Sequence, residues 1–200
     1  MKNVLLKVDD TKKEWEKSFK TLYIAIAKIF GDDTFRNVTK VKRQAAFNVW
    51  DDKIIDFIQH KTAEQVGHIR GTTKDELKYI ILKGLDEDKN TDEIAKDIRR
   101  RFKHFKKERA ETIAVTEVAS ISNYGSIMGA TQSGIELFKI WINVGDSRVR
   151  DSHSEMDDYP PIKLDEAFQV GNSLMQYPGD PNGGIQETIR CRCTLDYINQ

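Results

Sequence analysis

A histidine, an aspartate and two cysteines in the last quarter of the chain are of the types that bind zinc. His153 and Asp157 are four residues apart, so on a helix they would lie on one face. Cys191 and Cys193 are two residues apart, so on a strand they would share a face, with about 7 Å between their Cα atoms. One imidazole, one carboxylate and two thiolates form a tetrahedral zinc set. These four residues are therefore a candidate zinc site.

Two other interpretations of the same residues stay open. Zinc sites usually have two or more residues between paired cysteines, so this spacing would need a bulge or an offset strand for both sulfurs to reach one metal. Without a metal, the cysteines would be small buried apolar residues and His153 would pair with an acid. A catalytic Cys–His pair is the third interpretation, although the sequence offers no evident oxyanion hole or activated thiolate.

A group of charged residues of alternating sign lies between Trp141, a predicted core residue, and His153. The group could bind a ligand or a nucleic acid. The interpretation that we favour is an ion-pair network that ties the loop to the strand of Trp141. Its members are Asp146, Arg148, Arg150 and Asp151.

Two further carboxylates have predicted structural roles. Glu117 lies among apolar helix positions, so we expect it to be partly buried and to need a partner. We expect Arg148 or Arg150 to reach it and so to join the helix to the loop. Asp180 stands between a glycine and a proline, where its side chain would bond nearby backbone N–H groups of a turn.

Seven basic residues lie within eleven positions between Arg99 and Arg109. Acidic residues precede them, so the run could complement the dipole of a helix, with acids at its start and bases at its end. Clustered basic side chains also release counterions on binding DNA. The run is thus a candidate contact for DNA or for an acidic protein partner, and its candidate residues are Arg99, Arg100, Arg101, Lys103, Lys106 and Lys107.

Apolar residues recur at three- and four-residue steps over most of the first 130 positions, which predicts helices. The first helix is expected to contain residues 15–30 and to end at Gly31. A second is expected from about Thr39 to Phe57, and a long one from about Glu108 to Ala130.

The period changes after Gly134 and predicts short strands. Residues 137–144 alternate as in a strand, residues 151–157 could form one or two helical turns, and residues 191–198 form a terminal strand. The predicted fold is therefore α+β, with a helical N-terminal region and a small mixed domain of short strands and loops. The predicted divisions are a helical region over 1–70, a helical connector with the basic run over 71–108, and a domain over 109–200.

Three groups of residues, in order, resemble the phage Mu gpF-like head-morphogenesis domain over roughly residues 73–198. The first group begins at Arg109 and includes Glu117. The second consists of Trp141, Asp146, Arg148-Val149-Arg150, Ser152-His153 and Asp157. The third consists of Tyr177-Pro178-Gly179-Asp180-Pro181, Glu187, Ile189 and Cys191-Arg192-Cys193.

The chain departs from that family pattern at two positions. Asp158 stands where the family usually has glycine, and Arg190 stands where it usually has asparagine. A glycine at the first position suggests a turn with positive φ, which aspartate tolerates better than most residues. The departures weaken any activity tied to those positions but leave the resemblance intact.

The resemblance implies a minor head protein of a tailed phage or prophage. Such a protein is expected to associate with the portal protein and the major capsid protein during procapsid assembly. Its expected location is the virion head, and the host bacterial cytoplasm during assembly. DNA is a further expected contact. We expect no catalytic turnover. The alternatives are a toxin-like or nucleic-acid-processing enzyme that uses His153, Asp157, Cys191 and Cys193, and a DNA-binding accessory protein.

The distribution of charge agrees with two different roles along the chain. The formal net charge is zero, but residues 1–109 carry 26 basic and 19 acidic side chains, and residues 110–200 carry 6 and 13. The basic part suits an acidic partner or DNA. The richest apolar stretch, residues 22–30, is too short for a membrane span, and two cysteines with one residue between them do not make a secreted disulfide scaffold.

Overall fold

The computed structural model describes residues 2–40, 47–68, 79–81, 83–85, 87–101 and 107–199. The chain forms two compact units, which we describe separately. The first contains residues Met1–Ala25 and Val49–Ala110, and the second contains residues Ile26–Asn48 and Glu111–Gln200. Helices combine with short antiparallel strands, so the predicted α+β class is confirmed. Among the described residues, no helix combines the length and the apolarity that crossing a membrane requires.

The first unit is helical in its described parts. It holds the N-terminal part of α1 (Lys2–Thr39), α2 (Asp52–His68) and α4 (Thr91–Arg101). Two of these boundaries correct the predictions: α1 continues through Gly31 to Thr39, and α2 begins only at Asp52. Lys53 N donates to the Asp51 carboxylate, which caps α2. Trp50, expected inside the second helix, precedes it and is 64% exposed.

The described part of the basic run forms the last turn of helix α4. Asn90 and Glu93 form reciprocal hydrogen bonds between side chain and backbone at its start, which is a capping arrangement. Its acidic first turn and basic last turn, with Arg99, Arg100 and Arg101, match the helix dipole. Arg100 pairs with Asp97. Lys103, Lys106 and the side chains of Lys107 and Arg109 lie outside the described residues.

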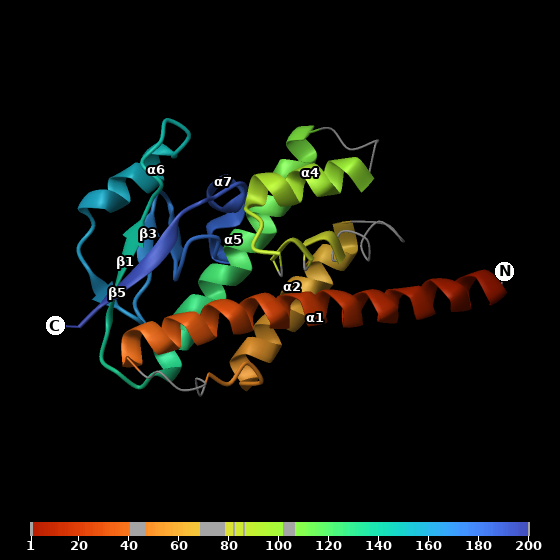
Figure 1. Ribbon diagram of the computed structural model, residues 1–200, viewed down its shortest axis with the longest axis horizontal. Helices are drawn as coiled ribbons and strands as arrows, with labels where there is room; N and C mark the ends of the chain where they lie inside the picture. The colour runs from red at the N-terminus through yellow and green to blue at the C-terminus, as the bar shows by residue number, and fades with distance from the viewer. Residues whose placement is uncertain are drawn as a thin grey trace. The chain divides into compact units, whose positions relative to one another are not determined.

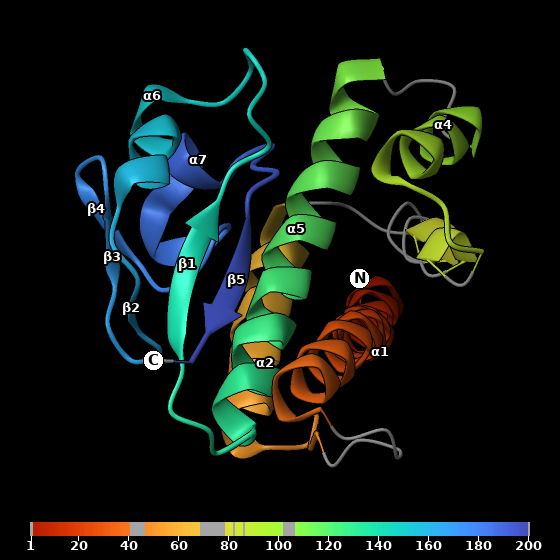
Figure 2. The same ribbon diagram turned by 60° about the vertical axis from the view of Figure 1, so that its left-hand side comes forward.

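The second unit is built on α5 (Lys107–Gln132), the long helix that the sequence predicts. A three-stranded antiparallel sheet lies beside it in the order β2-β1-β5, and β3 and β4 form a separate hairpin. Figure 1 shows β1 and β5 side by side, and Figure 2 shows α5 running along β5. The strands are β1 (Phe138–Ile142), β2 (Ile162–Lys163), β3 (Phe168–Val170), β4 (Ser173–Met175) and β5 (Thr194–Ile198).

Hydrogen bonds from α5 hold the loops and strands of the second unit in place. Ser120 Oγ donates to Gly179 O at 2.8 Å, and Asn123 Nδ2 donates to Cys193 O at 3.0 Å. Ser126 Oγ lies 2.9 Å from Tyr197 Oη on β5. These contacts place the loop around Asp180 and the loop before β5 against the same helix.

Short helices lie between several of the strands, and two of them carry His153 and Asp157 of the predicted zinc set. The predicted helical turns over 151–157 are confirmed as α6 (Asp151–Ser154) and the 3-10 helix η1 (Glu155–Asp158). The 3-10 helix η2 (Pro181–Gly183) leads directly into α7 (Gly184–Thr188). The predicted strand over 137–144 is confirmed by β1, and the terminal strand begins at Thr194 rather than at Cys191.

Candidate functional site

His153 lies at the centre of a buried cluster in the second unit. Helix α6 begins when His153 N and Ser154 N donate to Arg150 O, at 2.9 and 2.8 Å, and the turn directs the imidazole inward. The His153 side chain is fully buried, and the Trp141 ring meets it edge-on at a centroid distance of 5.3 Å. The prediction that Trp141 is a core residue is confirmed.

Both cysteines face the same nitrogen of this histidine. His153 Nδ1 lies 3.4 Å from Cys193 Sγ and 3.8 Å from Cys191 Sγ. The three potential ligand atoms all lie within 4.8 Å of one another. Residues 191–193 form a loop before β5 rather than part of the strand. An irregular loop can turn two sulfurs separated by one residue toward one point, which a regular strand would hold farther apart.

Asp157, the fourth predicted ligand, lies outside this cluster. Its side chain is exposed and accepts a hydrogen bond from Asn143 Nδ2 at 2.6 Å. The physical reason is that the α-helix ends at Ser154 and the chain tightens into η1, so the four-residue spacing no longer puts Asp157 on the face of His153.

Glu187, which the sequence did not single out as a site residue, supplies the carboxylate instead. Its Oε2 lies 3.1 Å from His153 Nε2 and accepts a hydrogen bond from Ser152 Oγ at 2.9 Å. Glu187 lies on α7 and is buried. The sequence feature that could have indicated Glu187 is its position four residues before Cys191, within the third group of residues that carry the family resemblance.

A bidentate ion pair fixes the cysteine loop to the loop after β1. Arg192, between the two cysteines, donates to both oxygens of Asp146, at 2.6 and 2.7 Å. Arg148 donates to the same carboxylate through its backbone N at 3.0 Å and its Nη2 at 3.1 Å. The hydrogen bonds from Arg192, aided by those from Arg148, hold the pKa of Asp146 well below its usual range. Of the predicted network, the structure shows the pair of Asp146 and Arg148, which the unforeseen Arg192 joins. Arg150 instead donates to a backbone carbonyl.

The arginines of this loop do not pair with Glu117, so that prediction is wrong. Arg148 contacts Asp146, and Arg150 donates to Ile189 O beyond α7. The Arg148 side chain is 71% exposed. Glu117 itself is buried, as the sequence predicts.

The thiols of the cluster influence each other. The hydrogen bond from Cys193 lowers the pKa of Cys191, and the charges of Arg150 and Arg192 act in the same direction. That same hydrogen bond, together with burial, raises the pKa of Cys193. The arrangement thus favours proton loss at Cys191.

Two buried charged residues of the second unit, Asp180 and Lys139, form hydrogen bonds with its loops. Asp180 accepts hydrogen bonds from Gln176 N at 2.7 Å and Asn182 N at 2.9 Å, so its predicted role in a turn is confirmed. Lys139 on β1 was not predicted to be buried, yet its residue is fully enclosed. Burial lowers its pKa to about 8, against the opposing effects of nearby carboxylates, of which Asp180 is the first.

The positive backbone angle expected at Asp158 occurs instead at Arg190. Asp158 lies in the regular 3-10 helix η1, whereas Arg190 has φ of 55°. Left-handed backbone is unfavourable for a long side chain and is best tolerated by glycine and asparagine. Asparagine, which the resemblance leads us to expect at this position, would therefore fit the backbone of this chain better than arginine.

Replacing Arg190 with asparagine is expected to raise the free energy of unfolding by about 0.5 kcal/mol, because relief of a strained φ outweighs loss of an exposed ion pair. That pair joins Arg190 to Glu111 at 3.2 Å. Arg190→Ala, which loses the pair but keeps the strain, is the control for urea unfolding. Equal or lower stability of Arg190→Asn relative to Arg190→Ala would contradict the expectation.

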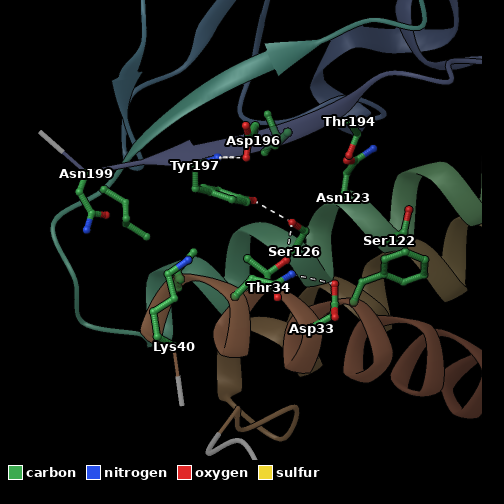
Figure 3. A pocket seen from close by; sticks show the side chains of 15 residues that line it. Asp33, Thr34, Lys40, Ser122, Asn123, Ser126, Thr194, Asp196, Tyr197 and Asn199 are labelled. Carbon is green, nitrogen blue, oxygen red and sulfur yellow. Dashed lines mark hydrogen bonds between the residues drawn. The ribbon is translucent and has the colours of Figure 1, made fainter. Parts of the chain in front are cut away.

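A separate open pocket of about 570 Å³ lies between the C-terminal part of α1, α5 and β5 (Figure 3). Its lining combines polar and apolar side chains. Thr34 Oγ1 and Tyr197 Oη both lie 2.9 Å from Ser126 Oγ within it. None of the sequence-predicted site residues lines it.

Comparison with known proteins identifies relatives of the chain. The family model described as "Phage Mu protein F like protein" matches residues 75–196. The uncharacterized protein YqbB of Bacillus subtilis (strain 168) is 24% identical over 159 residues, which cover 78% of this chain. The match covers 52% of YqbB, so the chain spans about half the length of this curated relative. No solved structure matches the chain.

Proposed function

Because the chain belongs to the phage Mu protein F like family, we propose that it is a phage head-morphogenesis protein that acts as a minor head component during procapsid assembly. The family match over residues 75–196 carries this proposal, since it includes the buried cluster and the ion-pair network. We further propose the portal protein and the major capsid protein as its partners.

The burial of the family residues supports assembly over catalysis. His153, Cys191 and Cys193 are 1%, 2% and 5% exposed, so a substrate has little access to them. Their neighbours Asp146, Arg192 and Glu187 make hydrogen bonds within the unit. A catalytic group must reach the atom on which it acts. The same residues are well placed to hold loops in a fixed form for recognition by a partner.

Co-sedimentation tests the proposal. The full chain, mixed with procapsids of the phage or prophage that encodes it, is expected to sediment with the particles at a few copies each. Particles assembled without portal protein are expected to retain much less of it, because the proposed docking site includes the portal. The measurement is quantitative immunoblotting of gradient fractions.

Two controls distinguish docking from other causes of sedimentation. Nuclease treatment should leave the protein on the particles, whereas release would indicate attachment through DNA. Raising the salt concentration tests for nonspecific charge contacts, which weaken strongly with salt. Absence of the chain from portal-containing particles would contradict the proposed function.

A further inference from the structure

We propose that His153, Cys191 and Cys193 bind one zinc ion and that Glu187 orients the histidine. The proposal goes beyond the assembly function and does not depend on it. It rests on where three donor atoms lie, on which histidine nitrogen faces them, and on what holds the other nitrogen.

The spacing of the donor atoms matches a tetrahedral zinc site. With Zn–S of about 2.3 Å and Zn–N of about 2.0 Å, tetrahedral angles place the nitrogen about 3.5 Å from each sulfur. The observed distances from His153 Nδ1 are 3.4 Å to Cys193 Sγ and 3.8 Å to Cys191 Sγ, one on each side of this value. Small side-chain rotations would therefore bring all three donors to one ion.

The two ring nitrogens of His153 have different partners. When Nε2 donates to Glu187 Oε2 at 3.1 Å, neutral His153 presents a single lone pair at Nδ1. Two sulfurs converge on that one lone pair, which can accept a full hydrogen bond from only one thiol. An ion between the three atoms satisfies all of them, since both thiolates and Nδ1 then act as donors to the metal.

Glu187 completes an arrangement that is common around zinc. A metal-bound histidine almost always donates its other N–H to a carboxylate or carbonyl, which fixes the ring orientation and makes the ligand more basic. Ser152 Oγ donates to the same Glu187 oxygen at 2.9 Å, so the carboxylate is itself held in place. Glu187 is thus a positioning residue rather than a ligand.

The donor set selects zinc among the common metals, because thiolate and imidazole together suit it, whereas magnesium and calcium prefer oxygen. Three protein donors leave one position of a tetrahedron, which water can fill. The ion would join α6 to the loop before β5, segments 38 to 40 residues apart along the chain. It would therefore act as a crosslink within the second unit.

Metal analysis of the purified full chain tests the proposal. After growth with added zinc and removal of loose metal, mass spectrometry is expected to find about one zinc per chain and little copper or iron. Replacement by Co²⁺ should give a sulfur-to-metal charge-transfer band and the strong visible bands of a tetrahedral site. Less than a tenth of an equivalent of zinc in folded protein would overturn the proposal.

Variants locate the ion. Cys191→Ser and Cys193→Ser should each lose the bound zinc, and Glu187→Gln should keep it with affinity lowered about 10- to 100-fold. Asp157→Asn is the matched control, because the structure places this carboxylate outside the cluster, and it should retain a full equivalent. Retention of zinc by both cysteine variants, or its loss in Asp157→Asn, would overturn the assignment.

One measurement remains informative if the cysteine variants do not fold. The chain has only two cysteines, so titration of the wild-type protein with an organomercurial reports on this cluster alone. Zinc release should rise with added reagent and end at two equivalents. Release that does not follow thiol modification would overturn the proposal.

Discussion

Replacing Gly129 with valine is expected to lower the free energy of unfolding by about 3 kcal/mol, the upper part of the usual range for overpacking a core. Gly129 lies on α5, where the backbone of α1 passes so close that an added Cβ would overlap Gly31 O. One turn earlier, a Cβ on Gly125 would lie 2.5 Å from Ala27 O. α1 and α5 therefore need small residues at both of these points of close contact.

The cost is expected to be large because the obstructing atoms are backbone. A clash with the end of a flexible side chain is relieved by a rotamer change, but a helix carbonyl can move only with its whole helix. Moving that part of α1 would also disturb Phe47, whose ring lies against Gly31. Buried residues on both helices, such as Ile26 and Ile121, would lose contacts as well.

The measurement is urea unfolding followed by circular dichroism, with Gly134→Ala as a matched control. Gly134 follows α5, has φ of 67° and has open space where a Cβ would stand, so its replacement costs only about 1 kcal/mol of backbone strain. Gly129→Ala should fall between the two variants. Equal losses for Gly129→Val and Gly134→Ala would show that close helix packing is not the cause.

This crossing also explains where the sequence-based helix prediction failed. Gly31 after a run of apolar residues is a common stop signal, and it predicted the end of the first helix. In the structure, α1 continues to Thr39, since glycine serves there for close approach to α5 and Phe47. Local pattern cannot distinguish these two uses of glycine, because the second depends on a helix about one hundred residues away.

The elements predicted by strong periodicity were found in place. α5 and β1 follow directly from apolar spacing and alternation. The site was only partly predictable. His153, Cys191 and Cys193 come together, but the carboxylate partner depends on whether the turn after Ser154 stays α-helical or becomes a 3-10 helix. That difference is too small for residue spacing to resolve, and the four-residue spacing from His153 indicated Asp157 alone.

Alternation along β1 did not reveal which face is buried. Phe138 and Ile140 are apolar, yet the buried positions of the strand are Lys139 and Trp141. Register explains this, since Trp141 stands opposite Leu195 on β5 and therefore shares its buried face. A lysine on that face must find acceptors, and the loops between β2 and α7 provide them.

Replacing Lys139 with methionine is accordingly expected to lower the free energy of unfolding by about 2–4 kcal/mol, although the new side chain fits the volume and removes a buried charge. Lys139 Nζ donates to Leu164 O at 3.0 Å, Gln176 O at 2.9 Å and Gln176 Oε1 at 2.8 Å. Methionine would leave these three acceptors without their donor. Lys163→Met, at an exposed position of β2, is the matched control and should change stability by less than about 0.5 kcal/mol.

The pH dependence supplies an independent check on Lys139. Burial lowers its pKa from 10.5 to about 8 in the folded protein, so the folded state releases this proton before the unfolded state does. Between those two values the unfolded chain binds more protons, and stability from this group must rise with pH. The difference in free energy of unfolding between wild type and Lys139→Met should thus increase by about 1–2 kcal/mol between pH 8 and pH 10. This increase is smaller than the full pKa shift would give, because solvent and neighbouring carboxylates screen the charge. If this difference in free energy of unfolding stays constant or falls over this range, Lys139 keeps its proton. The three acceptors would then stabilise the ammonium by more than burial destabilises it.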